Sequence, residues 1–152
     1  MKNTPLPNWE KILLIILIVS SVIHFSNWGT QTVKHVLGVF FGTPLPDTTF
    51  LDPFIGIIAL AASILIFLGS ILRWHRKPLS LVFVMWGTGL FAAKAVFDIL
   101  NEILIVKQTS QNVSIAQIEE LAADIGSTLL LLAFWAIVFV YYLREGRKKE
   151  LA

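Results

Sequence analysis

Ionisable side chains recur at helical spacing in an otherwise apolar part of the sequence. Lys94, Asp98 and Glu102 follow one another at intervals of four residues, so in a helix they line one face. An ionisable group within the hydrocarbon of a membrane is costly and is by default a candidate functional group. A row of this kind can pair internally and fix helix packing, bind the polar end of a ligand, or handle protons as acid and base.

Two other segments bring polar groups to a similar depth if each of them crosses a membrane. At a rise of 1.5 Å per residue, His24 lies about 18 Å above the start of its span and Lys94 about 22 Å. Asp98 and Asp124 lie at about 28 Å, and Thr128 lies at about 22 Å. We therefore predict a polar layer in the outer half of the membrane, built from three helices.

Two tryptophans lie below this predicted layer, away from the interfaces where tryptophan is usually found. Trp86 lies about 10 Å and Trp135 about 12 Å above the inner boundary. Small residues nearby favour close helix packing with two buried indoles, and the alternative is a flat apolar ligand between the indoles. The candidate ligand-binding residues are therefore His24, Trp86, Lys94, Asp98, Glu102, Asp124, Thr128 and Trp135.

The composition places these groups in a membrane protein. The chain has 152 residues, of which 56% are hydrophobic and 14% charged, against about 25% charged in a soluble domain. This excludes a water-soluble monomer. Continuous apolar runs predict an all-α fold, a single domain over residues 1–152 with four transmembrane helices near 12–27, 54–73, 79–104 and 122–143.

The basic residues predict the orientation of these spans. Nine of the twelve Lys and Arg residues flank the two chain termini or lie in the short turn between the second and third spans. The positive-inside rule therefore places both termini and this turn in the cytoplasm, in a plasma membrane or a bacterial inner membrane. The first span is expected to remain uncleaved, because no small-residue cleavage site follows it.

Two further helical features are expected on the outer side. Apolar residues at helical spacing between Val33 and Phe41 predict a separate amphipathic helix in the first outer loop. Ser114 begins a capping box that ends at Gln117, which predicts that the fourth helix begins near Ile115.

Motifs for metals, cofactors and nucleic acid are missing from the sequence. The chain contains no cysteine, so thiolate metal sites and cysteine nucleophiles are excluded. His24 is the only histidine within a predicted span, and haem would need a second histidine on a facing span. A net charge of +2 gives no nucleic-acid footprint.

Several short segments resemble the EXPERA-domain family, which includes the sigma-2 receptor and the emopamil-binding sterol isomerase. The resemblance lies in 67–70, in the basic turn 73–78, in the acidic end of the third span at 98–102, and in His24. It covers roughly residues 12–145 and implies a sterol-like or lipid-like ligand in a cavity open to the membrane. The family also carries carboxylates in its first two spans. Here the second span has none, so the resemblance favours binding over isomerase chemistry.

The sequence leaves three functions open. It favours a non-enzymatic or weakly enzymatic protein that binds a hydrophobic small molecule, or a lipid- or sterol-like ligand, in an intramembrane cavity with a polar outer end; isomerase-type acid/base chemistry is expected only if the resemblance to the EXPERA-domain family holds. The alternatives are a small transporter or ion-pathway subunit using Lys94 and Asp98, and an assembly subunit of a larger membrane complex or homo-oligomer.

Overall fold

The fold consists of four long α-helices. The computed structural model describes residues 6–42, 51–109 and 115–150. The helices are α1 (Asn8–Phe40), α2 (Asp52–Trp74), α3 (Ser80–Thr109) and α4 (Ile115–Glu150). The predicted all-α class is confirmed, and α1, α2 and α4 are long and apolar enough to cross a membrane.

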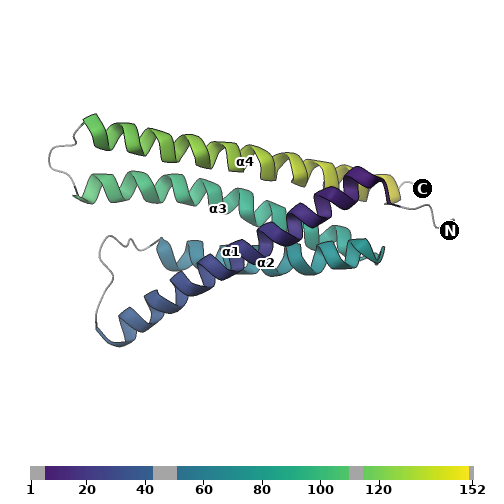
Figure 1. The fold of residues 1–152 in the computed structure, drawn as a ribbon, viewed down its shortest axis with the longest axis horizontal. Coiled ribbons are helices and arrows are strands. Elements are labelled where there is room, and N and C mark those ends of the chain that lie inside the picture. The colour runs from purple at the N-terminus through teal and green to yellow at the C-terminus, as the bar shows by residue number, and fades with distance from the viewer. Residues whose placement is uncertain (1–5, 43–50, 110–114, 151–152) are drawn as a thin grey trace.

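The helices pack in chain order, as Figure 1 shows. The backbones of α1 and α2, of α2 and α3, and of α3 and α4 approach closely, whereas no such approach joins α1 to α4 among the described residues. Both chain termini and the α2–α3 turn lie at one end of the bundle, which we call the terminal end (Figure 1). At the opposite end, the loop end, α1 diverges from the antiparallel pair α3–α4 (Figure 1).

Helix α1 is longer than the sequence analysis predicted. Residues 33–40 are helical as expected, but the prediction of a separate helix is wrong because α1 continues without interruption to Phe40. The polar residues after Trp28 had indicated a loop. Instead they remain in the helix, where Thr30 Oγ1 donates a hydrogen bond of 2.9 Å to the Ser26 carbonyl one turn earlier. The helix ends at Phe40, and Gly42, two residues later, has a φ of 66°, which is typical of a glycine that closes a helix.

Helix α4 begins at Ile115, as predicted. Ser114, the first residue of the proposed capping box, lies outside the described residues, so that part of the prediction stays untested. The helix extends beyond both ends of the predicted span 122–143. Its 36 residues correspond to about 54 Å, well beyond the roughly 30 Å of membrane hydrocarbon.

Helices α2 and α3 pack closely through glycines. A Cβ atom at Gly69 would lie 2.7 Å from the backbone nitrogen of Val84, and one at Gly87 would lie 2.9 Å from the backbone nitrogen of Ile66. Only glycine fits at such separations, so both positions fix the contact between the helices. The turn that joins them is tight, with the Lys77 N–H bonded to the Leu72 carbonyl at 2.8 Å.

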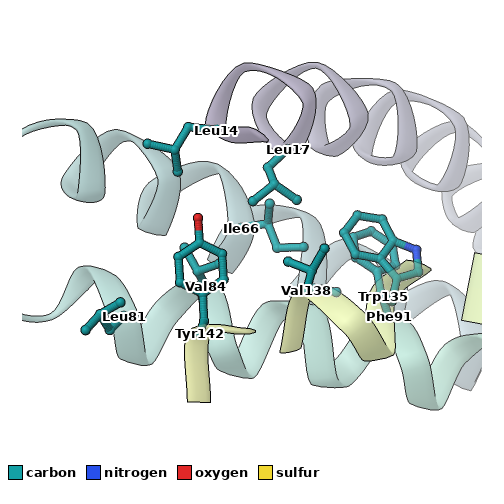
Figure 2. Close-up of a cluster of buried hydrophobic side chains, with 10 residues drawn as sticks. Leu14, Leu17, Ile66, Leu81, Val84, Phe91, Trp135, Val138 and Tyr142 are labelled. Carbon is teal, nitrogen blue, oxygen red and sulfur yellow. The ribbon is translucent and has the colours of Figure 1, made fainter. Parts of the chain in front are cut away.

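A cluster of buried apolar side chains fills the bundle between its terminal end and its middle (Figure 2). Here α1 and α4 meet through their side chains, although their backbones stay apart. Trp9 and Tyr141 pack edge to face with ring centroids 5.0 Å apart. The cluster comprises Leu14, Leu17, Ala62, Ile66, Leu81, Val84, Phe91, Trp135, Val138 and Tyr142. The interior therefore closes toward the terminal end and opens toward the loop end.

Candidate functional site

Lys94 is buried in the middle of the bundle and holds two helices together. Its ammonium group forms an ion pair with the Asp98 carboxylate one turn later, as the sequence spacing indicated. The same ammonium lies 4.3 Å from the centroid of the Trp28 ring on α1. A cation over an indole face is attracted by the electron-rich ring, so Lys94 links α3 to α1.

An aromatic group from three helices lies next to this ion pair. Phe91 on α3 and Trp135 on α4 stack with centroids 4.6 Å apart and an interplanar angle of 16°. The His24 ring on α1 lies 4.7 Å from Phe91 and 6.4 Å from Trp135. In this way the imidazole bridges α1 to the α3–α4 pair by ring packing.

A small pocket of about 20 Å³ lies between the ion pair and the aromatic group. This volume is enough for about one water molecule and far too small for an organic ligand. The pocket is lined by His24, Phe91, Lys94, Ala95, Asp98, Thr128, Leu131 and Trp135. The indole level of the bundle is therefore packed and does not form a ligand-sized cavity.

A much larger cleft opens toward the loop end, with a volume of about 1100 Å³. All four helices contribute to its walls, and Asp98 lines both this cleft and the small pocket below it. Four carboxylates line it, from α2, α3 and α4, namely Asp52, Asp98, Glu102 and Asp124. Asn101 Nδ2 donates a hydrogen bond of 3.2 Å to Asp52 Oδ1, which joins α3 to the start of α2 at this level.

The α1 wall of the cleft has a different chemistry. It presents side chains with hydroxyl and amide groups, such as Ser26, Asn27 and Gln31, together with Lys34 and His35. The basic groups of the lining thus come from α1, and the acidic groups come from the other three helices. The cleft has walls of opposite charge.

The length of α2 places this cleft relative to a membrane. Its 23 residues correspond to about 34 Å, close to the thickness of membrane hydrocarbon. If Trp74 marks one boundary, then Asp52 and its partner Asn101 mark the other. Lys94 lies seven residues before Asn101 on the same helix, which is about 10 Å deeper.

The structure brings most of the predicted site residues together on two levels. Asp98, Glu102, Asp124 and Thr128 line the cleft. Three of the other four, His24, Lys94 and Trp135, lie at the small pocket beneath it. Their role in ligand binding stays a prediction.

Trp86 lies elsewhere, and the prediction that both indoles are buried is wrong for it. Its side chain is 61% exposed on the outside of the bundle. The physical reason is helix phase. Gly87 faces Ile66 of α2, so the preceding residue, rotated by about 100° on the helix, points away from that contact.

Several residues at these sites were missed by sequence reasoning. Lys34, His35 and Asn101 line the cleft but were not candidates, because the length of α1 and the way the helices cross were unknown. Trp28, whose ring lies against the Lys94 ammonium, was not a candidate either. A signal was available for the α1 residues, since polar residues recur at helical spacing in Asn27, Thr30, Gln31 and Lys34 without a proline to end the helix.

Comparison with known proteins gives no match to a protein-family model, to a curated protein or to a solved structure. The resemblance to the EXPERA-domain family therefore stays a prediction, and function is argued from the geometry. In the described ranges, no group of three or more histidine or acidic side chains is arranged to hold a metal ion.

Proposed function

We propose that the chain is a multi-pass membrane protein in which α3 forms a fourth span between α2 and α4. The other three helices are long and apolar enough to cross a membrane. Because α3 packs along two of them, α2 and α4, it would cross the membrane with them. The terminal end then faces the cytoplasm, since Arg73, Arg76 and Lys77 lie in the last turn of α2 and the turn after it, and Arg144 lies in the last part of α4. The cleft at the loop end faces the opposite side.

The function that the geometry supports best is the binding of an amphiphilic molecule, with its polar part in the cleft. The observation that carries this proposal is the cleft itself, which places polar side chains from four otherwise apolar helices around about 1100 Å³. Pockets of about 300–1000 Å³ suit small organic ligands, so the volume is adequate. Because the cleft lies near the expected membrane boundary, the apolar part of such a ligand can remain in the lipid.

Binding is favoured over ion conduction by the state of Lys94 and by the packing of the core. The ammonium of Lys94 is already engaged by Asp98 and Trp28. Toward the terminal end the interior is occupied by fully buried side chains, including Leu14, Leu17 and Tyr142. Ion conduction would require both the ion pair and this packing to rearrange.

A steric substitution at Ser127 tests the proposal. Ser127 lines the cleft, and its hydroxyl bonds to the Asp124 carbonyl of its own helix at 2.9 Å, so Ser127→Phe chiefly adds volume. The matched control is Leu130→Phe, at a position on α4 that is 75% exposed. A fluorescent single-chain amphiphile is titrated into the purified protein in detergent.

We expect Ser127→Phe to weaken binding at least tenfold and Leu130→Phe to leave it unchanged. If both variants bind like the unmodified protein, the cleft is not the binding site. If the unmodified protein does not bind the amphiphile at all, the proposed function is wrong.

A further inference from the structure

The opposite charges of the cleft walls indicate what kind of headgroup the cleft accepts. We propose that it binds a phospholipid whose headgroup carries both a phosphate and a primary ammonium group, the chemistry of phosphatidylethanolamine. This inference rests on the proposed function and specifies its ligand class.

The phosphate is assigned to the α1 wall. Lys34 and His35 are consecutive residues that both line the cleft. Lysine binds phosphate as a compact positive charge with three donors, and neighbouring hydroxyl and amide groups add neutral donors. Gln31 supplies such an amide group about one helical turn before Lys34 and His35, whereas the Thr30 hydroxyl already donates to the Ser26 carbonyl.

The ammonium is assigned to the opposite wall. Glu102 on α3 and Asp124 on α4 present carboxylates to the same cleft. A primary ammonium can donate hydrogen bonds to carboxylates, whereas a quaternary ammonium has no N–H and prefers an aromatic face. The nearby aromatic face, that of Trp28, already carries the Lys94 ammonium. The site therefore favours a primary ammonium over choline.

The excess of acid in the lining also disfavours lipids with a net negative charge. Four carboxylates face the cleft, and the Lys94 ion pair neutralises that of Asp98. The remaining three exceed the charge of Lys34, so a headgroup with a phosphate but no ammonium meets net repulsion.

The position of the cleft fits a lipid ligand. It lies at the level of Asp52, at the boundary where headgroups of the surrounding lipid lie. Beneath it, the side between α1 and α4 lacks close backbone contact within the described part of the chain. Leu131 lines the small pocket there and is 48% exposed, so it offers an acyl chain an apolar surface leading out of the cleft.

The test compares four lipids with the same dioleoyl chains. Three are phospholipids, whose phosphate carries ethanolamine, choline or glycerol, and the fourth is diacylglycerol, which has no phosphate. Each lipid is titrated into the purified full chain in detergent, and binding is measured by native mass spectrometry. We expect the affinity for the ethanolamine lipid to exceed that for each of the other three by roughly three- to fivefold, because ion pairs exposed to water contribute only modestly to binding.

Two variants distinguish the contribution of the α1 wall from that of the acidic wall. Lys34→Gln is expected to weaken binding of the ethanolamine lipid roughly threefold and to leave diacylglycerol unchanged. Glu102→Gln is expected to weaken the ethanolamine lipid and to strengthen the glycerol phosphate lipid. The control Lys77→Gln removes an exposed lysine at the terminal end and should change neither.

Equal binding of all four lipids overturns this inference but leaves the proposed function intact. The same holds if Lys34→Gln and Lys77→Gln affect binding equally, or if the choline lipid binds as tightly as the ethanolamine lipid. If none of the four lipids binds while the single-chain amphiphile does, the inference is wrong and the proposed function stands; if the amphiphile fails to bind as well, both are wrong.

Discussion

The buried ion pair between Glu10 and Arg73 allows a sharp prediction about stability. Arg73 Nε donates a hydrogen bond of 2.7 Å to Glu10 Oε1, which joins the first turn of α1 to the last turn of α2. The exposed fractions of the two side chains are 8% and 3%. Removal of either partner leaves the other as an uncompensated charge in a mostly dehydrated position.

The magnitude follows from the burial of both groups. Breaking a buried pair from one side costs about 3–5 kcal/mol, because the remaining charge keeps its desolvation penalty. Removing both charges together is expected to leave the free energy of unfolding roughly unchanged or to raise it, since no unpaired charge remains. Glu10→Gln and Arg73→Met should therefore each be far more destabilising than the double variant.

The assay is a double-mutant cycle on the free energy of unfolding, measured in mixed micelles with increasing denaturing detergent. The control Lys77→Met removes an exposed basic residue from the α2–α3 turn that follows Arg73 and should cost less than about 0.5 kcal/mol. The reasoning is refuted if the single variants are as mild as this control, or if their effects simply add in the double variant.

Two paired substitutions test helix packing. Gly69→Ala should destabilise the bundle by about 1–3 kcal/mol because its Cβ would collide with the α3 backbone, whereas Gly126→Ala, with open space around it, should be neutral or stabilising in the same unfolding assay. Trp135→Ala should cost about 3–5 kcal/mol through loss of its stack on Phe91. Trp86→Ala, on the outer surface, should cost much less, and equal thermal stabilities of these two variants would contradict the assigned helix phases.

The parts of the fold that sequence reasoning predicted are those governed by local pattern. Apolar runs of sufficient length indicated the helices, and the start of α4 at Ile115 followed from capping chemistry. The pairing of Lys94 with Asp98 required only a four-residue spacing in a helix. None of these predictions depends on how one helix packs against another.

The errors concern features that depend on helix phase and crossing. Depth along a span can be counted, but it does not say which way Trp86 points, and that side chain lies outside the bundle. The sequence shows that small residues lie near Trp86, but it does not show which of them contacts α2. Only the contact of Gly87 with Ile66 of α2 fixes the direction of the neighbouring Trp86 side chain. The partner of Arg73 was missed for the same reason, because its proximity to Glu10 arises only where α1 crosses α2.

The cleft itself was not predicted, because a ligand cavity was expected at the level of the indoles. Counting depth did place Asp98, Asp124 and Thr128 in one layer, and these three residues line the cleft. The α1 wall was not foreseen, because the segment after Trp28 was interpreted as an irregular loop. Its continuation as a helix is what brings Lys34 opposite the acidic wall.

The most direct test of the account asks whether the cleft contains water and opens to the outer side. The chain has no cysteine, so Ser127→Cys and Leu130→Cys each introduce a single thiol without background. Thiols react with maleimides as thiolates, which requires access to water. A membrane-impermeant maleimide added to sealed cells should modify Ser127→Cys, more slowly when the amphiphile is present, and should leave Leu130→Cys unmodified. If the thiol of Ser127→Cys reacts no faster than that of Leu130→Cys, or reacts only from the cytoplasmic side, the account is contradicted.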